Sequence, residues 1–173
     1  NSAREIEEVV ITALRKETNL QDTAITITAI TGADLEVKQI ENFEDLQFAV
    51  PTLGFQKGAY SGSGITLRGI GNFAVGNSTS ASIGYFWNGQ TASASGLYEQ
   101  EFFDVERVEV LRGPQGSLFG AGTTGGLIQM ITKRPDAEAG GYLKADVADY
   151  DSLRMEGAIN LPLTDKLRSR FAF

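Results

Sequence analysis

Apolar and polar residues alternate with a period of two near the end of this sequence, and no other feature constrains the fold as strongly. Between residues 153 and 161, one set of alternate positions is apolar and the other is mostly polar. The two sets are Leu153, Met155, Gly157, Ile159 and Leu161, and Arg154, Glu156, Ala158 and Asn160. Successive side chains of a strand point to opposite faces. The segment therefore predicts a strand with one apolar and one polar face, and residues 142–147 and 167–173 repeat the pattern.

Strands of this kind are typical of transmembrane β-barrels, which use about 9 to 11 residues per strand, with lipid on one side and a wet lumen on the other. Residues 137–173 therefore predict the first antiparallel strands of such a barrel. Two or three strands cannot close, and an open edge in hydrocarbon leaves costly unpaired backbone groups. We expect this barrel to be truncated here and the natural protein to continue well beyond Phe173.

Residues 20–136 predict a separate domain, an α+β fold with a small mixed sheet and short helices. Residues 25–30 alternate apolar and hydroxyl side chains, the pattern of a half-buried strand. Residues 105–111 predict the clearest strand, with valines on one face and charges on the other. A last strand is expected at 127–132, and Pro135 closes the domain.

Two helix starts follow the first strand of this domain. Thr31 stands three residues before Asp34, so its hydroxyl can cap a helix that runs to about Ile40. Asn42 can cap a second helix, which Pro51 ends.

Glycine- and serine-rich stretches separate the remaining strands. Residues 54–97 are mostly Gly, Ser, Asn and Thr, with strands predicted at 65–68 and 83–87. A second Gly-rich connection covers residues 113–126. These stretches predict long loops at one end of a small sheet.

The composition excludes most catalytic chemistry. The chain has no Cys and no His, which removes thiolate nucleophiles, imidazole bases and soft-ligand metal sites. Its carboxylates are spread along predicted strands and helices without a convergent motif, so we expect no enzyme, no cofactor and no metal. With 15 Lys and Arg against 22 Asp and Glu, the net charge is −7 and a nucleic acid partner is not expected.

Two glycine motifs imitate nucleotide-binding loops. Residues 69–74 match the dinucleotide pattern after a strand, but a poor helix follows and no acidic residue stands about 20 positions on. Residues 120–125 have the spacing of a phosphate loop, but Gly126 stands where that motif requires Lys. Neither motif predicts a nucleotide site.

Four colinear segments carry a resemblance to a known family. Residues 104–135 read DVERVEVLRGPQGSLFGAGTTGGLIQMITKRP, and this segment resembles the central signature of the plug domain of TonB-dependent receptors. EEVVITA at 7–13 resembles the TonB box, residues 31–53 resemble the first plug helices, and ITLRGIG at 65–71 resembles the Arg-Gly strand. The family often has Asp in place of Asn88 and Asn in place of Gln129.

The resemblance implies the plug of an outer-membrane importer, with the plug inside its own barrel and residues 1–19 as a tail in the periplasm. Such a plug gates the energised import of a scarce nutrient: a siderophore, a metal chelate, cobalamin or a saccharide. The implied partners are a TonB-type energy-transducing protein, the rest of the barrel and a small-molecule substrate. The alternative is a stand-alone periplasmic binding or regulatory module with a plug fold.

The box itself is suited to strand addition, because an extended segment can join an exposed sheet edge through main-chain hydrogen bonds. Its residues are Glu7, Glu8, Val9, Val10, Ile11, Thr12 and Ala13. A frayed tail that binds nothing is the alternative interpretation.

Further site residues follow from the resemblance. Arg68 and Arg112 each precede a glycine at a predicted strand end, and they are expected to form ion pairs between plug and barrel, unless they are solvated strand-end arginines. Loop aromatics could contact substrate or instead pack on the sheet; these are Tyr60, Phe73 and Tyr98. Structural glycines, expected at positions of positive φ or close packing, are Gly69, Gly113, Gly116, Gly120, Gly125 and Gly126.

Overall fold

The computed structural model describes residues 10–11, 18–19, 26–58, 63–71, 82–92, 98–148, 152–164 and 166–173. The chain divides into two compact units, Asn1–Thr132 and Lys133–Phe173. This division falls shortly before the boundary expected near residue 136, and the domain limits inferred from the sequence stay predictions. Among the described residues, no helix is long and apolar enough to cross a membrane.

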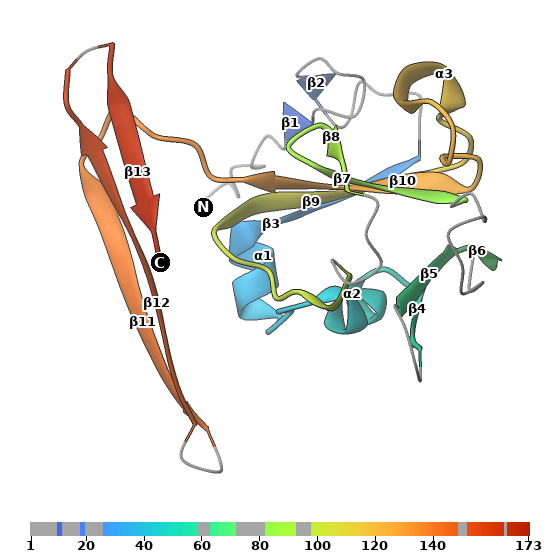
Figure 1. The fold of residues 1–173 in the computed structure, drawn as a ribbon, viewed down its shortest axis with the longest axis horizontal. Coiled ribbons are helices and arrows are strands. Elements are labelled where there is room, and N and C mark those ends of the chain that lie inside the picture. The colour runs from blue at the N-terminus through green and yellow to red at the C-terminus, as the bar shows by residue number, and fades with distance from the viewer. Residues whose placement is uncertain are drawn as a thin grey trace, which may run out of the picture. The chain divides into compact units, whose positions relative to one another are not determined.

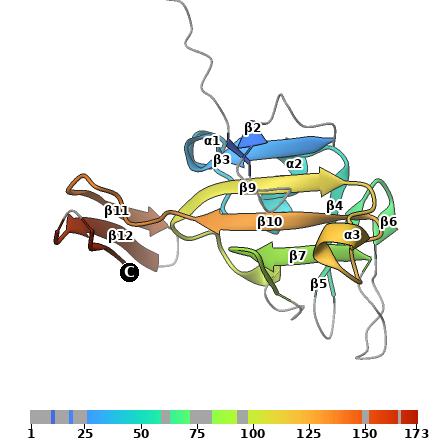
Figure 2. The same ribbon diagram turned by 90° about the horizontal axis from the view of Figure 1, so that it is seen from above.

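A five-stranded mixed sheet forms the centre of the first unit (Figures 1 and 2). Its strands, in spatial order, are β3 (Ile27–Thr31), β9 (Val105–Arg112), β10 (Gly126–Thr132), β7 (Ile83–Trp87) and β8 (Gln90–Thr91). β10 runs parallel to β7, and the other neighbours are antiparallel. The predicted α+β fold with a small mixed sheet is confirmed.

Two short helices follow β3 as expected, α1 (Gly32–Val37) and α2 (Phe43–Ala49). The hydroxyl of Thr31 accepts a hydrogen bond from the amide of Asp34 at 3.2 Å, so the predicted N-cap is confirmed. The side chain of Asn42 likewise caps α2.

The first helix ends earlier than the sequence predicts, at Val37 instead of about Ile40. Gln39 adopts a φ of 53°, and the amide of Ile40 donates to the carbonyl of Leu35 at 2.9 Å. This is the hydrogen-bonding pattern that ends many helices, here with glutamine in the position usually held by glycine.

The first unit also holds smaller sheets. β4 (Leu53–Lys57), β5 (Ser63–Leu67) and β6 (Ile70–Gly71) form an antiparallel sheet, and near the N-terminus β1 (Val10–Ile11) pairs with β2 (Thr18–Asn19). The turn between β5 and β6 has φ values of 54° at Arg68 and 78° at Gly69. Among two-residue hairpin turns, type I′ requires positive φ at both central residues.

Both faces of the five-stranded sheet are buried, with α1 and α2 on one side and α3 (Gly116–Phe119) on the other (Figure 1). Phe43 and Leu46 of α2 are fully buried in the larger core cluster, which also contains Val108 and Val110. On the other side, Phe119 of α3 joins a smaller apolar cluster. The sequence predicts only a Gly-rich connection where α3 forms.

A β-bulge in β9 explains how its valines share one face. Val105 and Val108 are three residues apart, so a regular strand would place them on opposite faces. The register shifts from Ile131 opposite Arg107 to Thr132 opposite Val105, which leaves one extra residue in β9. The bulge brings Val105 into the same core cluster as Val108.

The second unit is an antiparallel sheet of β11 (Gly140–Ala148), β12 (Ser152–Pro162) and β13 (Arg168–Ala172). The apolar face of β12 is exposed, with Leu153 at 65% and Met155 at 56% exposure. On its opposite face, Ala158 and Asn160 are buried. The alternation read from the sequence therefore describes a sheet whose apolar face is exposed.

Candidate functional site

The box residues are described at two positions. Val10 and Ile11 form β1, whose backbone pairs with Asn19 and Thr18 of β2. An extended backbone is what strand addition requires. The other box residues, Glu7, Glu8, Val9, Thr12 and Ala13, lie outside the described residues, and the role of the box stays a prediction.

Arg112 stands at the end of β9, where two threonine hydroxyls hold its guanidinium. Its Nη2 donates to the hydroxyl of Thr28 at 2.6 Å, and its Nε donates to that of Thr52 at 3.0 Å. Within the described part of the chain, Arg112 has no ion-pair partner. Because hydroxyls do not neutralise its charge, the oriented guanidinium can still pair with a carboxylate from elsewhere.

Arg68 lies next to the same threonine. Its amide donates to the carbonyl of Thr52 at 2.8 Å, while its side chain is exposed. No ion pair is found for Arg68 among the described residues. The structure thus brings both predicted arginines to Thr52 and leaves both without a carboxylate partner in the part of the chain that it describes.

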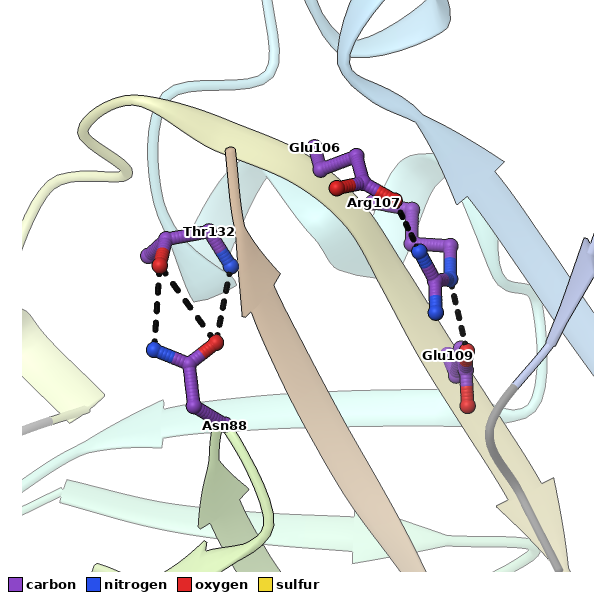
Figure 3. Close-up of polar contacts among 5 residues, drawn as sticks. All are labelled: Asn88, Glu106, Arg107, Glu109 and Thr132. Carbon is purple, nitrogen blue, oxygen red and sulfur yellow. Dashed lines mark hydrogen bonds and ion pairs between the residues drawn. The ribbon is translucent and has the colours of Figure 1, made fainter. Parts of the chain in front are cut away.

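A buried ion pair on β9 was not singled out in the sequence (Figure 3). Arg107 donates from Nε to a carboxylate oxygen of Glu109 at 2.8 Å, and it also contacts Glu106. The side chain of Arg107 is 10% exposed and that of Glu109 is fully buried. Glu109 lies opposite Gln129 in β10 and Ala29 in β3. The sequence signal for this pair is the alternation of charged residues with valines in β9. Because β9 lies between two other strands, both of its faces are buried, so Arg107 and Glu109 are buried as well.

Asn88 holds the end of β10 through its side chain (Figure 3). Its Oδ1 accepts a hydrogen bond from the amide of Thr132 at 3.0 Å, and its Nδ2 donates to the hydroxyl of Thr132 at 3.0 Å. The sequence marked Asn88 as a departure from the family, without assigning it this contact.

Tyr98 packs in the core instead of standing free in a loop. Its ring centre lies 5.8 Å from that of Phe43 and 5.5 Å from that of Tyr85. Burial raises the pKa of Tyr98, and burial together with the neighbouring Tyr98 raises the pKa of Tyr85. This geometry favours the packing interpretation for Tyr98. Tyr60 and Phe73 lie outside the described residues.

Five of the six glycines singled out in the sequence occupy special positions. Gly69, Gly113, Gly120 and Gly126 have positive φ, and a Cβ on Gly125 would lie 2.7 Å from Ile83. The prediction of special geometry at Gly116 is wrong. This residue begins α3 with ordinary backbone geometry, and a Cβ there would have no atom within 4 Å. No group of three metal-ligating side chains occurs among the described residues.

Comparison with known proteins places these features in a family. The family model described as TonB-dependent Receptor Plug Domain matches residues 19–127, more than half of the chain. The ferric enterobactin receptor of Pseudomonas aeruginosa is 31% identical over 190 residues, covering 98% of this chain and 25% of that protein. The pesticin receptor of Yersinia pestis is 41% identical over 68 residues, covering 39% of this chain and 10% of the receptor.

Solved structures agree. The ferric yersiniabactin uptake receptor from Yersinia pestis matches with a TM-score of 0.72 and 26% identity, over 84% of this chain and 23% of that chain. The ferripyoverdine receptor of the outer membrane of Pseudomonas aeruginosa matches in fold with a TM-score of 0.73 and 23% identity, over 95% of this chain and 22% of that chain. This chain therefore spans a quarter or less of the length of each of these four relatives.

These relatives are all named as receptors, one of them as an uptake receptor and one as a receptor of the outer membrane. The match to the plug model covers β3, β9, both capped helices and the start of β10. The chain belongs to the TonB-dependent receptor plug family.

Proposed function

We propose that this chain is the plug, with the first wall strands, of an outer-membrane receptor that imports a ferric siderophore. The observation that carries the proposal is the plug match over residues 19–127 together with relatives named for ferric siderophores. Among the nutrient classes that the sequence left open, those names favour siderophores over cobalamin and saccharides.

The second unit supports a place in the membrane. Its apolar side chains point outward along β12, and Phe171 on β13 is also exposed, at 62%. An exposed face that carries several large apolar side chains is unfavourable in water. In our proposal, the face contacts lipid and the buried polar face, with Asn160, points into the barrel.

The two arginines at Thr52 are proposed to hold the plug against the barrel wall. Arg112 is oriented by two hydroxyls and Arg68 is exposed, so each can receive a wall carboxylate without moving another charge. Ion pairs at such a water-accessible boundary can break and form again, as a gate requires.

The tail is proposed to bind the energy-transducing protein through residues 7–13. Because β1 already has an extended backbone, it can add to a sheet edge of the partner once it leaves β2. Force on the tail then reaches the plug through the chain that leads to β3.

The test is iron uptake by cells whose sole siderophore receptor is the complete receptor that carries this chain. Ferric enterobactin, ferric pyoverdine and ferric yersiniabactin are the probes, and cobalamin is the control substrate. We expect uptake of one ferric probe, its loss in a receptor with Ile11→Pro, and its retention with Ile11→Val, because proline removes a backbone donor. Uptake of cobalamin alone, or equal uptake by both variants, would contradict the proposal.

A further inference from the structure

The passage of the chain from the first unit to the second is held at both ends by asparagine side chains. Thr132 ends β10 and is the last residue of the first unit. Asn88 binds both its amide and its hydroxyl, at 3.0 Å each. Backbone pairing between β10 and β7 ends at Met130, so the Asn88 side chain extends that ladder by one further step (Figure 3).

The second asparagine holds the start of the second unit. Asn160, on the buried face of β12, accepts from the amide of Asp136 at 2.9 Å and donates to its carbonyl at 3.1 Å. The same side-chain amide also donates to the carbonyl of Glu138. Asn160 is 4% exposed, so these bonds replace hydration that this side chain has lost.

Little chain remains free between these two anchor points. The Cα path from Thr132 to Asp136 spans at most about 14 Å when fully extended. Within the second unit, the Lys133 ammonium lies 5.5 Å from the centre of the Tyr142 ring, and Pro135 restricts its own φ. The junction is therefore a short connection with few free torsions.

The register of the sheet shows why a fixed end at Thr132 matters. Ile27 at the start of β3 pairs with Leu111, which pairs with Leu127 at the start of β10. β3 and β10 thus run in the same direction, and Thr132 lies at the opposite end of the sheet from Ile27. A pull on the tail against an anchor at Thr132 acts along the strands and loads their hydrogen bonds together.

We propose that Asn88 and Asn160 are positioning residues that make this junction the fixed end of the plug. While the tail is pulled, they keep β10 joined to the first barrel strand by a short connection. The applied force therefore acts on the hydrogen bonds of β3. This inference rests on the proposed function, because it needs a pulled tail and a wall.

The chemistry of the two clamps differs, and that difference supplies matched variants. Both bonds of Asn88 with Thr132 can be accepted by a carboxylate, because the threonine amide and hydroxyl both donate. Asn88→Asp should therefore act as wild type and Asn88→Ala should not. At Asn160 the side chain donates to two carbonyls, so Asn160→Asp should lose both of these bonds, as Asn160→Ala does, while it keeps an acceptor for the Asp136 amide.

The experiment uses the complete receptor with two readouts, ferric siderophore binding against energised uptake, and hydrogen exchange in peptides covering residues 128–140. In Asn88→Ala and Asn160→Ala, exchange at Thr132 and at Asp136, respectively, should rise about tenfold, because each amide loses its one hydrogen bond. Uptake should be lost while binding stays. Inserting Gly-Ser after Arg134 leaves every clamp bond in place and should also abolish uptake.

Wild-type exchange in the alanine variants, or unchanged uptake despite faster exchange, would overturn the inference. Unchanged uptake with the Gly-Ser insertion would do so as well, even if a clamp variant failed to fold. Failure of the proposed function looks different, because the wild-type receptor itself would then import no ferric siderophore.

Discussion

Replacing Gly126 with alanine tests the geometry of the sheet centre. Gly126 begins β10 and pairs on one side with Arg112 and on the other with Ile83. Its φ is 139°, and a Cβ there would lie 2.3 Å from the carbonyl oxygen of Leu111 and 3.0 Å from a methyl group of Leu67. Because Gly126 lies between β9 and β7, neither strand can move away from an added Cβ without breaking backbone hydrogen bonds to β10.

Two costs add at this position. A side chain in a backbone region reserved for glycine costs about 1 to 3 kcal/mol. Overpacking an interior site costs about 1 to 3 kcal/mol more. Gly126→Ala should therefore lower the free energy of unfolding by about 2 to 6 kcal/mol, a large share of the roughly 5 to 15 kcal/mol typical of a domain.

The assay is urea unfolding of the chain followed by the fluorescence of Trp87, its single tryptophan, which packs against the core. Gly116→Ala is the matched control, because a Cβ there meets no atom within 4 Å. The control should stay within about 0.5 kcal/mol of wild type. The reasoning is refuted if the two variants unfold at the same midpoint with the same slope.

Three further changes test other parts of the structure. Glu109→Leu leaves Arg107 without its buried carboxylate and should cost about 3 to 5 kcal/mol in the same assay; the double variant Arg107→Met with Glu109→Leu should lose less than the two single changes together. Burial raises the pKa of Tyr85 above the ordinary 10.0, so the unfolded chain ionises first and stability should fall as the pH rises above that value. Tyr85→Phe should flatten that fall in unfolding curves from pH 8 to about 11; an equally steep fall would contradict the assignment. Leu153→Arg places a charge on the exposed apolar face of β12. It should lower the stability of the receptor in the membrane by up to about 4 kcal/mol and so reduce receptor abundance in outer-membrane fractions, whereas Arg154→Gln should leave that abundance unchanged.

Local signals in the sequence predicted the elements that depend on neighbouring residues. Thr31 and Asn42 cap helices where their spacing indicates, because a cap is a contact within three residues. The alternation from Leu153 to Leu161 predicted the two faces of β12, since strand geometry alone decides them.

The features that the sequence did not reveal depend on distant partners. The bulge in β9 is visible only from its register with β10, and the burial of Glu109 follows from strands on both sides of it. α3 has four residues, too few for a helical period to appear. Gly116 was misassigned because it stands among glycines that do need special geometry.

For the candidate site residues as well, the sequence predicted what depends on a local motif and missed what depends on distant contacts. The arginines were found through their motif, but the shared contact with Thr52 depends on the turn before β4. Tyr98 was expected in a loop because Gly and Ser surround it, whereas contacts with Phe43 and Tyr85 place it against the core. The roles of the box and of the loop aromatics stay predictions.

The most direct test of the central claim is calorimetry of this chain with the periplasmic C-terminal domain of a TonB-type protein from the same organism. A variant that lacks residues 7–13 is measured beside it. Our account expects binding by the intact chain and none by the variant, because the box supplies the strand that adds to the partner. Equal binding by both forms, or binding by neither, would contradict the account.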